Sequence, residues 1–136
     1  RFQPDMFAPV NRRWGVNNRS AGLRIPIGPG EARRIEHRAA GADANPYLML
    51  AAILAGLHHG LTSKIDPGPA AVGNVSREPD TALPFSLDAA LEKLATGSVL
   101  GAYLGIETVE LYGETKRLEA KRFAKLISPA EYEWYL

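Results

Sequence analysis

The chain has 136 residues, enough for one domain with its own hydrophobic core. With 46% hydrophobic and 23% charged residues its composition is that of a globular protein, and a net charge of +1 gives no reason to expect nucleic acid or a membrane surface as a partner. The absence of cysteine excludes disulfides, zinc thiolate sites and thiol catalysis, and it suits a cytoplasmic protein.

Residues 1–40 carry loop and strand signals. Prolines at positions 4 and 9 predict a loop over residues 1–15, without the apolar run of a signal peptide. Two strands are predicted, Ala21 to Ile27 and Arg33 to Ala39, and the Gly28-Pro29-Gly30 turn between them predicts a hairpin. Because the chain starts with Arg1 inside this loop, we expect a piece of a longer protein.

The middle of the chain is predicted to be one helix and one long loop. Asp43 or Asn45 can cap a helix over residues 43–60, with Pro46 in its first turn and Gly60 at its end. This helix is apolar nearly all round, which predicts that other structure buries it. Residues 61–85 are rich in proline, and a loop of this length indicates a function or docking onto neighbouring structure.

Residues 86–136 are predicted to be mainly helical. Ser86 and Gly97 mark the ends of a first helix, residues 98–104 form another turn or two, and Ser128 to Glu131 is a capping box that opens a last short helix. A long helix is expected from Ile106 to Ile127, with ion pairs Glu114–Arg117 and Glu119–Arg122. The fold class is therefore α+β: short antiparallel strands followed by a mainly helical C-terminal region.

Positive charge is concentrated near the N-terminus. Eight of the 16 basic residues lie within the first 38 positions, and all eight are arginine. Arginine binds carboxylates and phosphates through two parallel hydrogen bonds, so this segment predicts an anion site. From the residues alone, a stand-alone module that binds anions or nucleic acid remains an alternative.

Arg34, Glu36 and Arg38 alternate along the second predicted strand, and a period of two places their side chains on one face. Phosphoryl transfer needs such a combination of fixed positive charge with a carboxylate that can hold a cation. From the spacing alone, a solvated ladder of ion pairs, Arg34–Glu36–Arg38, is the preferred interpretation. For Arg19 and Arg24 to reach one site, the chain must bulge or turn between them, and Gly22 is the natural place.

The histidines predict no metal site. His58 and His59 are adjacent on a helix and diverge by about 100°, so they cannot easily share a metal. Both suit the negatively polarised end of that helix. His37 is expected to pack behind its strand.

Three sequence motifs, in this order, resemble motifs of the glutamine synthetase family. They are Asn18-Arg19-Ser20-Ala21-Gly22-Leu23-Arg24-Ile25-Pro26, Arg33-Arg34-Ile35-Glu36-His37-Arg38 and Ala44-Asn45-Pro46-Tyr47-Leu48. The resemblance implies part of an enzyme that joins the side-chain carboxylate of glutamate to ammonia or a primary amine. ATP is the co-substrate, Mg²⁺ or Mn²⁺ the metal, and a homo-oligomeric ring the expected assembly, with no role for nucleic acid or a membrane.

The resemblance also implies roles for single residues. Arg19 and Arg38 would be catalytic, and Arg1 and Arg38 would bind glutamate. ATP would be bound by Arg19, Arg24 and Arg34, and Glu36 would be a metal ligand. The family's other metal ligands lie upstream of the matched region, so the 136 residues alone are expected to be inactive.

Two positions depart from the family pattern. Members that use ammonia carry a glutamate just before the Ala-Pro that corresponds to Ala8-Pro9, and Met6 and Phe7 stand there in this chain. Asp5 is the nearest acid. The departure favours an amine larger than ammonia as the acceptor. The second position that departs from the family pattern is Glu31, which stands where some members have a lysine near ATP.

Overall fold

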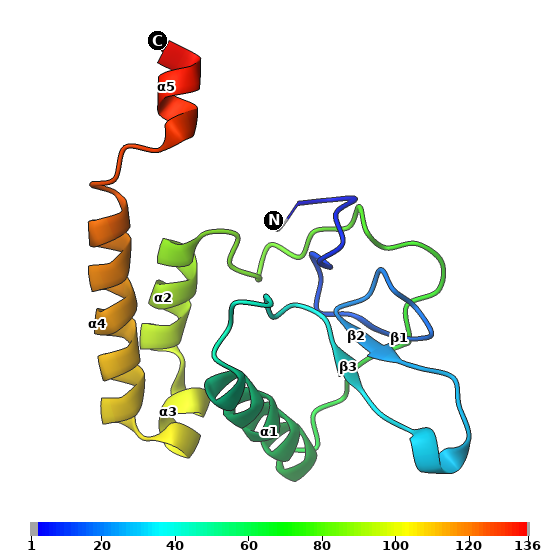
Figure 1. Cartoon of the computed structure of the whole chain (residues 1–136). Helices are drawn as coiled ribbons and strands as arrows, with labels where there is room; N and C mark the ends of the chain where they lie inside the picture. The colour runs from blue at the N-terminus through cyan, green and yellow to red at the C-terminus, as the bar shows by residue number, and fades with distance from the viewer. Residues whose placement is uncertain (1–2, 136) are drawn as a thin grey trace. The chain divides into compact units, whose positions relative to one another are not determined.

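The computed structural model describes residues 3–135, which fall into two compact units with the boundary between Phe85 and Ser86 (Figure 1). The first unit contains a three-stranded sheet and helix α1, and the second contains helices α2 to α5. This confirms the α+β class: short strands come first and helices follow. No helix within residues 3–135 is both long and apolar enough to cross a membrane.

The sheet consists of β1 (Trp14–Val16), β2 (Leu23–Ile25) and β3 (Glu36–His37), in that order. The antiparallel pairing of β2 with β3 confirms the predicted hairpin, although both strands are shorter than predicted. Their connection contains the short 3-10 helix η1 (Gly30–Ala32). Pro26 follows β2 directly, and it has no N–H to continue the ladder.

The prediction of a loop over residues 1–15 missed the start of β1. This strand pairs in parallel with β2, with Trp14 opposite Leu23. Three residues are too few to show an alternating pattern, and β1 depends on a partner that the chain reaches only after the turn at residues 17–22. Asn17 opens that turn with a left-handed backbone, φ 49°.

The long loop predicted over residues 61–85 docks against the sheet unit. We call residues 66–80 the strap. Its Ala71 N–H donates to the Trp14 carbonyl at 2.8 Å, and the Trp14 indole donates to the Gly68 carbonyl at 2.9 Å. Ala71 and Val75 of the strap are buried with Ala21 in the small core of this unit. The docking alternative for this loop is therefore confirmed.

Ion pairs reinforce the strap along its second half. They join it to the N-terminal segment at Asp5–Arg77, Arg13–Glu78 and Arg12–Asp80. Because each pair has at least one side chain that is more than half exposed, these pairs contribute less to stability than the buried contacts. They do fix which strap residue faces which residue of the N-terminal segment.

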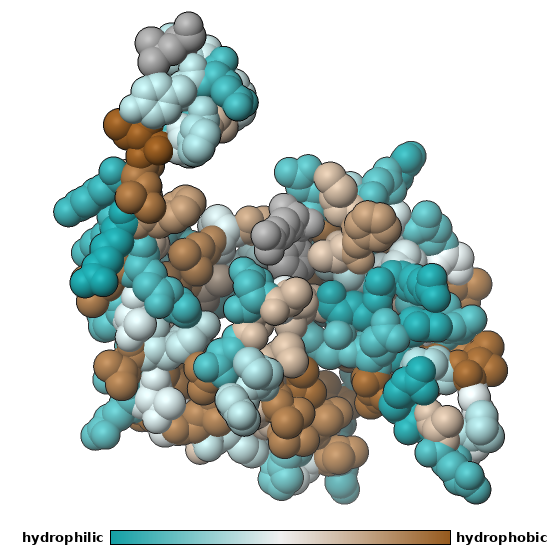
Figure 2. All heavy atoms as spheres, in the orientation of Figure 1, coloured by the Kyte–Doolittle hydropathy of each residue, from teal (hydrophilic) through white to brown (hydrophobic). Residues whose placement is uncertain are grey.

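Helix α1 (Pro46–Thr62) begins as predicted, with the Asn45 side chain accepting from the Tyr47 and Leu48 N–H groups at 3.0 and 3.2 Å. It ends two residues beyond the predicted Gly60. Within the described part of the chain only Ala55 of this helix is buried, and Tyr47 and Leu61 are 83% and 78% exposed. Figure 2 shows hydrophobic side chains gathered over α1. Burial of this helix by other structure therefore stays a prediction.

The second unit consists of α2 (Leu87–Thr96), α3 (Ser98–Leu104), α4 (Ile106–Phe123) and α5 (Pro129–Tyr135), with α2 and α3 packed against α4. The Ser86 cap and the Ser128–Glu131 capping box form as predicted. Helix α4 stops four residues before the predicted Ile127. Glu114 pairs with Arg117 as predicted, but Glu119 pairs with Lys116 instead of Arg122.

Candidate functional site: a cleft lined by arginines

An open cleft of about 760 Å³ lies in the first unit, formed by the N-terminal segment, the turn before β2, the β2–β3 pair and the strap. This volume lies within the range of about 300–1,000 Å³ that is typical of small-molecule sites. Eleven residues line it: Asp5, Met6, Phe7, Asn18, Arg19, Ser20, Arg24, Glu36, Arg38, Asn74 and Ser76. Arg19, Arg24, Glu36 and Arg38, all predicted site residues, therefore meet in one place.

The centre of the cleft is an Arg24–Glu36–Arg38 cluster. Arg24 and Glu36 are directly opposite each other on β2 and β3, which brings their side chains together on one face. Arg24 Nη1 lies 2.9 Å from Glu36 Oε2, and Arg38 Nε lies 3.2 Å from Oε1. Both guanidiniums are largely buried, with 16% and 18% of their side chains exposed.

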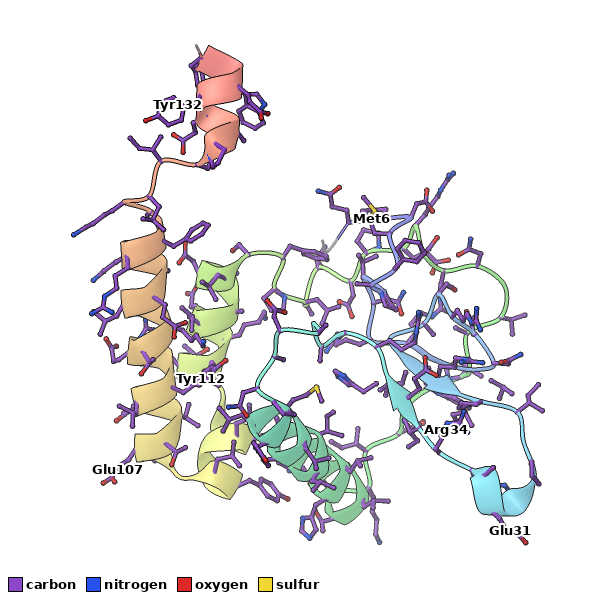
Figure 3. The ribbon with its side chains drawn as sticks, in the orientation of Figure 1. Met6, Glu31, Arg34, Glu107, Tyr112 and Tyr132 are labelled. Carbon is purple, nitrogen blue, oxygen red and sulfur yellow. The ribbon has the colours of Figure 1, made fainter. Side chains whose placement is uncertain are left out.

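Arg34 lies outside this cluster. The predicted alternation of Arg34, Glu36 and Arg38 assumed a regular strand, but β3 begins only at Glu36. The Arg34 side chain is exposed and donates to the Ala32 carbonyl at 3.2 Å. Figure 3 shows Arg34 and Glu31 by the β2–β3 connection and Met6 on the N-terminal segment. The expected solvated ladder Arg34–Glu36–Arg38 is therefore wrong: Glu36 pairs with Arg38 and with Arg24 from the neighbouring strand, and both guanidiniums are largely buried.

Two donors of the cluster have no hydrogen-bond partner among the described residues. They are Arg24 Nε and Arg38 Nη1, and both atoms are buried. A buried charged donor without a partner costs free energy until it meets an acceptor. Two such donors beside one cleft are suited to the oxygens of a phosphate or carboxylate.

Arg19 reaches the same cleft from the turn before β2. The backbone bends at residues 21 and 22, which confirms the predicted turn at Gly22. Gly22 packs directly onto the Asn11 carbonyl, where a Cβ would lie only 2.3 Å from the oxygen. This close approach allows the chain to reverse between Arg19 and Arg24. The Arg19 side chain is exposed, and no described residue binds its guanidinium.

Asn11, which was not among the predicted site residues, holds this turn through its side chain. Asn11 is 3% exposed. Its amide donates to the Ser20 and Val75 carbonyls at 3.0 and 3.2 Å, and its oxygen accepts from the Arg13 and Gly22 N–H groups. No pattern around Asn11 announces this role, because its partners are 2 to 64 residues away.

The rim of the cleft near the N-terminus is apolar. Met6 and Phe7 are 54% and 97% exposed. The adjacent Asp5 accepts from Ser76 Oγ at 2.8 Å and from Arg77 Nε at 2.5 Å. These hydrogen bonds lower the pKa of the Asp5 carboxyl below its ordinary value, so it stays ionised and tied to the strap.

A divalent-metal site does not form from the described residues alone. Among residues 3–135, no group of three or more His, Cys, Asp or Glu side chains could hold a metal ion. Mg²⁺ prefers six oxygen ligands in an octahedron, and Glu36 is one carboxylate whose two oxygens already face guanidiniums. Arg1, predicted to bind glutamate, lies outside the described residues.

Comparison with known proteins identifies the family of the chain. Residues 1–135 match the family model "Glutamine synthetase, catalytic domain". The chain therefore belongs to the glutamine synthetase catalytic-domain family.

Relatives of more than one kind match the chain. Gamma-glutamylputrescine synthetase PuuA of Escherichia coli K12 is 40% identical over 136 residues, which is all of this chain and 29% of the relative. Gamma-glutamylethanolamide synthetase GlnA4 of Streptomyces coelicolor is 33% identical over 131 residues, 96% of this chain and 28% of the relative. Glutamine synthetase of Methanocaldococcus jannaschii is 37% identical over 144 residues, all of this chain and 32% of the relative. The chain thus spans about three-tenths of the length of these relatives.

Proposed function

We propose that this chain supplies the part of a ligase active site that binds phosphate and glutamate. In the proposed reaction the side-chain carboxylate of glutamate attacks the γ-phosphorus of ATP and ADP leaves. A primary amine then attacks the γ-carbonyl carbon of the resulting γ-glutamyl phosphate and expels inorganic phosphate. The observation that carries the proposal is the pair of buried guanidiniums, Arg24 and Arg38, with donors directed to no described partner.

Each arginine of the cleft has a proposed role. Arg19 and Arg24 bind the phosphates of ATP, and Arg38 binds glutamate and the transferring phosphoryl group. Both steps build negative charge on phosphoryl oxygens, which fixed guanidiniums in a partly buried site stabilise. The proposed ATP contact of Arg34 and glutamate contact of Arg1 rest on family resemblance alone, since Arg34 lies outside the cleft lining.

Glu36 is proposed to give one ligand to Mg²⁺ or Mn²⁺ after other parts of the protein supply the remaining oxygens. Within this chain its visible role is electrostatic. It neutralises part of the charge of Arg24 and Arg38 and holds the two guanidiniums on one side of the cleft. The proposed binding of phosphate and glutamate by the arginines does not depend on whether Glu36 is a metal ligand.

We propose a primary amine larger than ammonia as the acceptor. The rim has Met6 and Phe7 where members that use ammonia are expected to have a glutamate, and Asp5 is occupied by Ser76 and Arg77. The alignment with PuuA has 136 positions for 136 residues, whereas that with the M. jannaschii glutamine synthetase has 144. That glutamine synthetase therefore has residues with no counterpart in this chain, whereas the alignment with PuuA contains no such additional residues.

A panel of acceptors tests this proposal. Phosphate release by the full-length protein that carries this chain is measured with ATP, glutamate and either ammonium, ethanolamine or putrescine. We expect at least one of the two larger amines to give a kcat/KM at least about tenfold above that of ammonium, a difference of about 1.4 kcal/mol in transition-state binding. Ammonium as the one productive acceptor would refute the assignment.

A further inference from the structure

Arg19 sits between two residues whose side chains are fixed to the strap. Asn18 Nδ2 donates to the Ala71 and Gly73 carbonyls at 3.2 and 2.9 Å. Asn18 Oδ1 accepts from the Ser20 N–H at 3.0 Å and from Ser20 Oγ at 2.6 Å. The amide therefore joins the strap to the turn that carries Arg19.

Ser20 makes the second connection. Its hydroxyl donates to Asn18 and accepts from the Val75 N–H at 2.9 Å, while the Asn11 amide binds the carbonyls of Ser20 and Val75. Every side-chain donor and acceptor of Asn11, Asn18 and Ser20 has a partner, which is the condition under which a polar network is rigid. We call Asn18 and Ser20, with these bonds, the clasp.

The clasp contrasts with the residue that it flanks. Arg19 is exposed and lines the cleft, and no described residue binds its guanidinium. The position of its backbone is therefore set by its neighbours on both sides. Arg24 and Arg38, in contrast, are held through their own side chains by Glu36.

We propose that Asn18 and Ser20 are positioning residues that aim Arg19 into the cleft by fixing its backbone to the strap. This inference rests on the proposed function for the role of Arg19 as a phosphate contact. A bound phosphate chain gains most from a guanidinium that is already in place, because less freedom is lost on binding. Loss of the clasp is therefore expected to weaken phosphate binding through Arg19.

The test uses the full-length protein and a double-mutant cycle. Ser20→Ala removes the hydroxyl, Ser20→Thr keeps it, and Thr115→Val deletes a hydroxyl that donates to the Leu111 carbonyl at 2.8 Å in the helical unit. Binding of inorganic triphosphate is measured by calorimetry. We expect Ser20→Ala to raise Kd by about tenfold, Ser20→Thr to stay within about twofold of wild type and Thr115→Val to change nothing.

The cycle with Arg19→Ala separates positioning from general support of the fold. If the clasp acts through Arg19, Ser20→Ala has little further effect in the Arg19→Ala background, and the two changes are strongly non-additive. An equal loss in both backgrounds, or a Kd for Ser20→Ala equal to that of wild type, overturns the proposal. Asn18→Ala, which removes the bonds to Ala71 and Gly73, repeats the cycle if Ser20→Ala folds poorly.

Turnover separates this inference from the proposed function. With ATP and glutamate, Ser20→Ala is expected to raise the KM for ATP by about tenfold while kcat changes by less than about threefold, because ground-state phosphate binding is affected first. A wild-type protein that binds triphosphate with the predicted coupling but releases no phosphate with any amine contradicts the ligase assignment and leaves the clasp standing.

Discussion

At the residue scale, Glu36 decides how the cleft is charged. Its carboxylate contacts Arg24 across the sheet and Arg38 farther along its own segment, so it fixes two guanidiniums that have unused donors. Without this carboxylate the two guanidiniums would repel each other in a partly buried site. If Glu36 also binds the metal in the full-length protein, that is a second reason why a carboxylate is needed at this position.

Glu36→Gln tests this residue with almost no change in shape. We expect phosphate release to fall by about a hundredfold or more, since the charge that orders both arginines is lost. The matched control is Glu107→Gln in the first turn of α4, where the side chain is exposed and outside the cleft lining, and its kcat/KM should equal that of wild type. Normal activity of Glu36→Gln with unchanged metal dependence would show that the assignment of Glu36 is wrong.

At the element scale, the turn at residues 17–22 links the fold to the site. It joins β1 to β2, contacts the strap, and carries Arg19 into the cleft. Its tightest point is Gly22 against the Asn11 carbonyl. A side chain there must displace backbone, because Asn11 is itself held by four hydrogen bonds.

Gly22→Ala is therefore expected to destabilise the protein by about 1–3 kcal/mol, the usual cost of overpacking. Chemical denaturation measures the change in the free energy of unfolding. Gly30→Ala in η1 is the control, because no atom lies within 4 Å of an added Cβ there, and it should shift this free energy by less than about 0.5 kcal/mol. Equal effects of the two changes would mean that the approach of Gly22 to Asn11 does not constrain the turn.

The elements that could be predicted from the sequence are those with local signals. Asn45, Ser86 and the Ser128–Glu131 box each mark a helix start through bonds that span two or three residues, and all three form. Strand β1 depends on pairing with β2 across the turn at residues 17–22, and the docked strap depends on bonds between residues more than 50 positions apart, such as Trp14 to Gly68. No local pattern encodes such contacts.

The site was predictable to the same extent. The motif words identified Arg19, Arg24, Glu36 and Arg38, which line one cleft. The geometry among them was not predictable, because the strand that was to carry Arg34 begins two residues later. Arg24 therefore meets Glu36 through strand register, which only the folded sheet defines.

At the scale of the whole molecule, the described residues supply one side of the proposed site and leave most of α1 at least partly exposed. They offer the arginines but no group of carboxylates for a metal, and α1 exposes apolar side chains such as Leu54 and Leu61. The matched region is 29% and 28% of the length of two of the relatives. Both features predict that other parts of the protein cover α1 and supply metal ligands.

The 136-residue chain alone should therefore release no phosphate from ATP above background with glutamate, Mg²⁺ and an amine, whereas the full-length protein should turn over. The reason is that a divalent cation needs several oxygen ligands, and the described residues provide one carboxylate that is already paired with two guanidiniums. Circular dichroism and thermal unfolding of the isolated chain show whether it is folded under the assay conditions.

If a folded chain of 136 residues were to release phosphate at the rate of the full-length protein, the division of the site between this chain and other segments would be wrong. Background release by the folded chain, together with turnover by the full-length protein, would place the missing part of the catalytic site outside these residues.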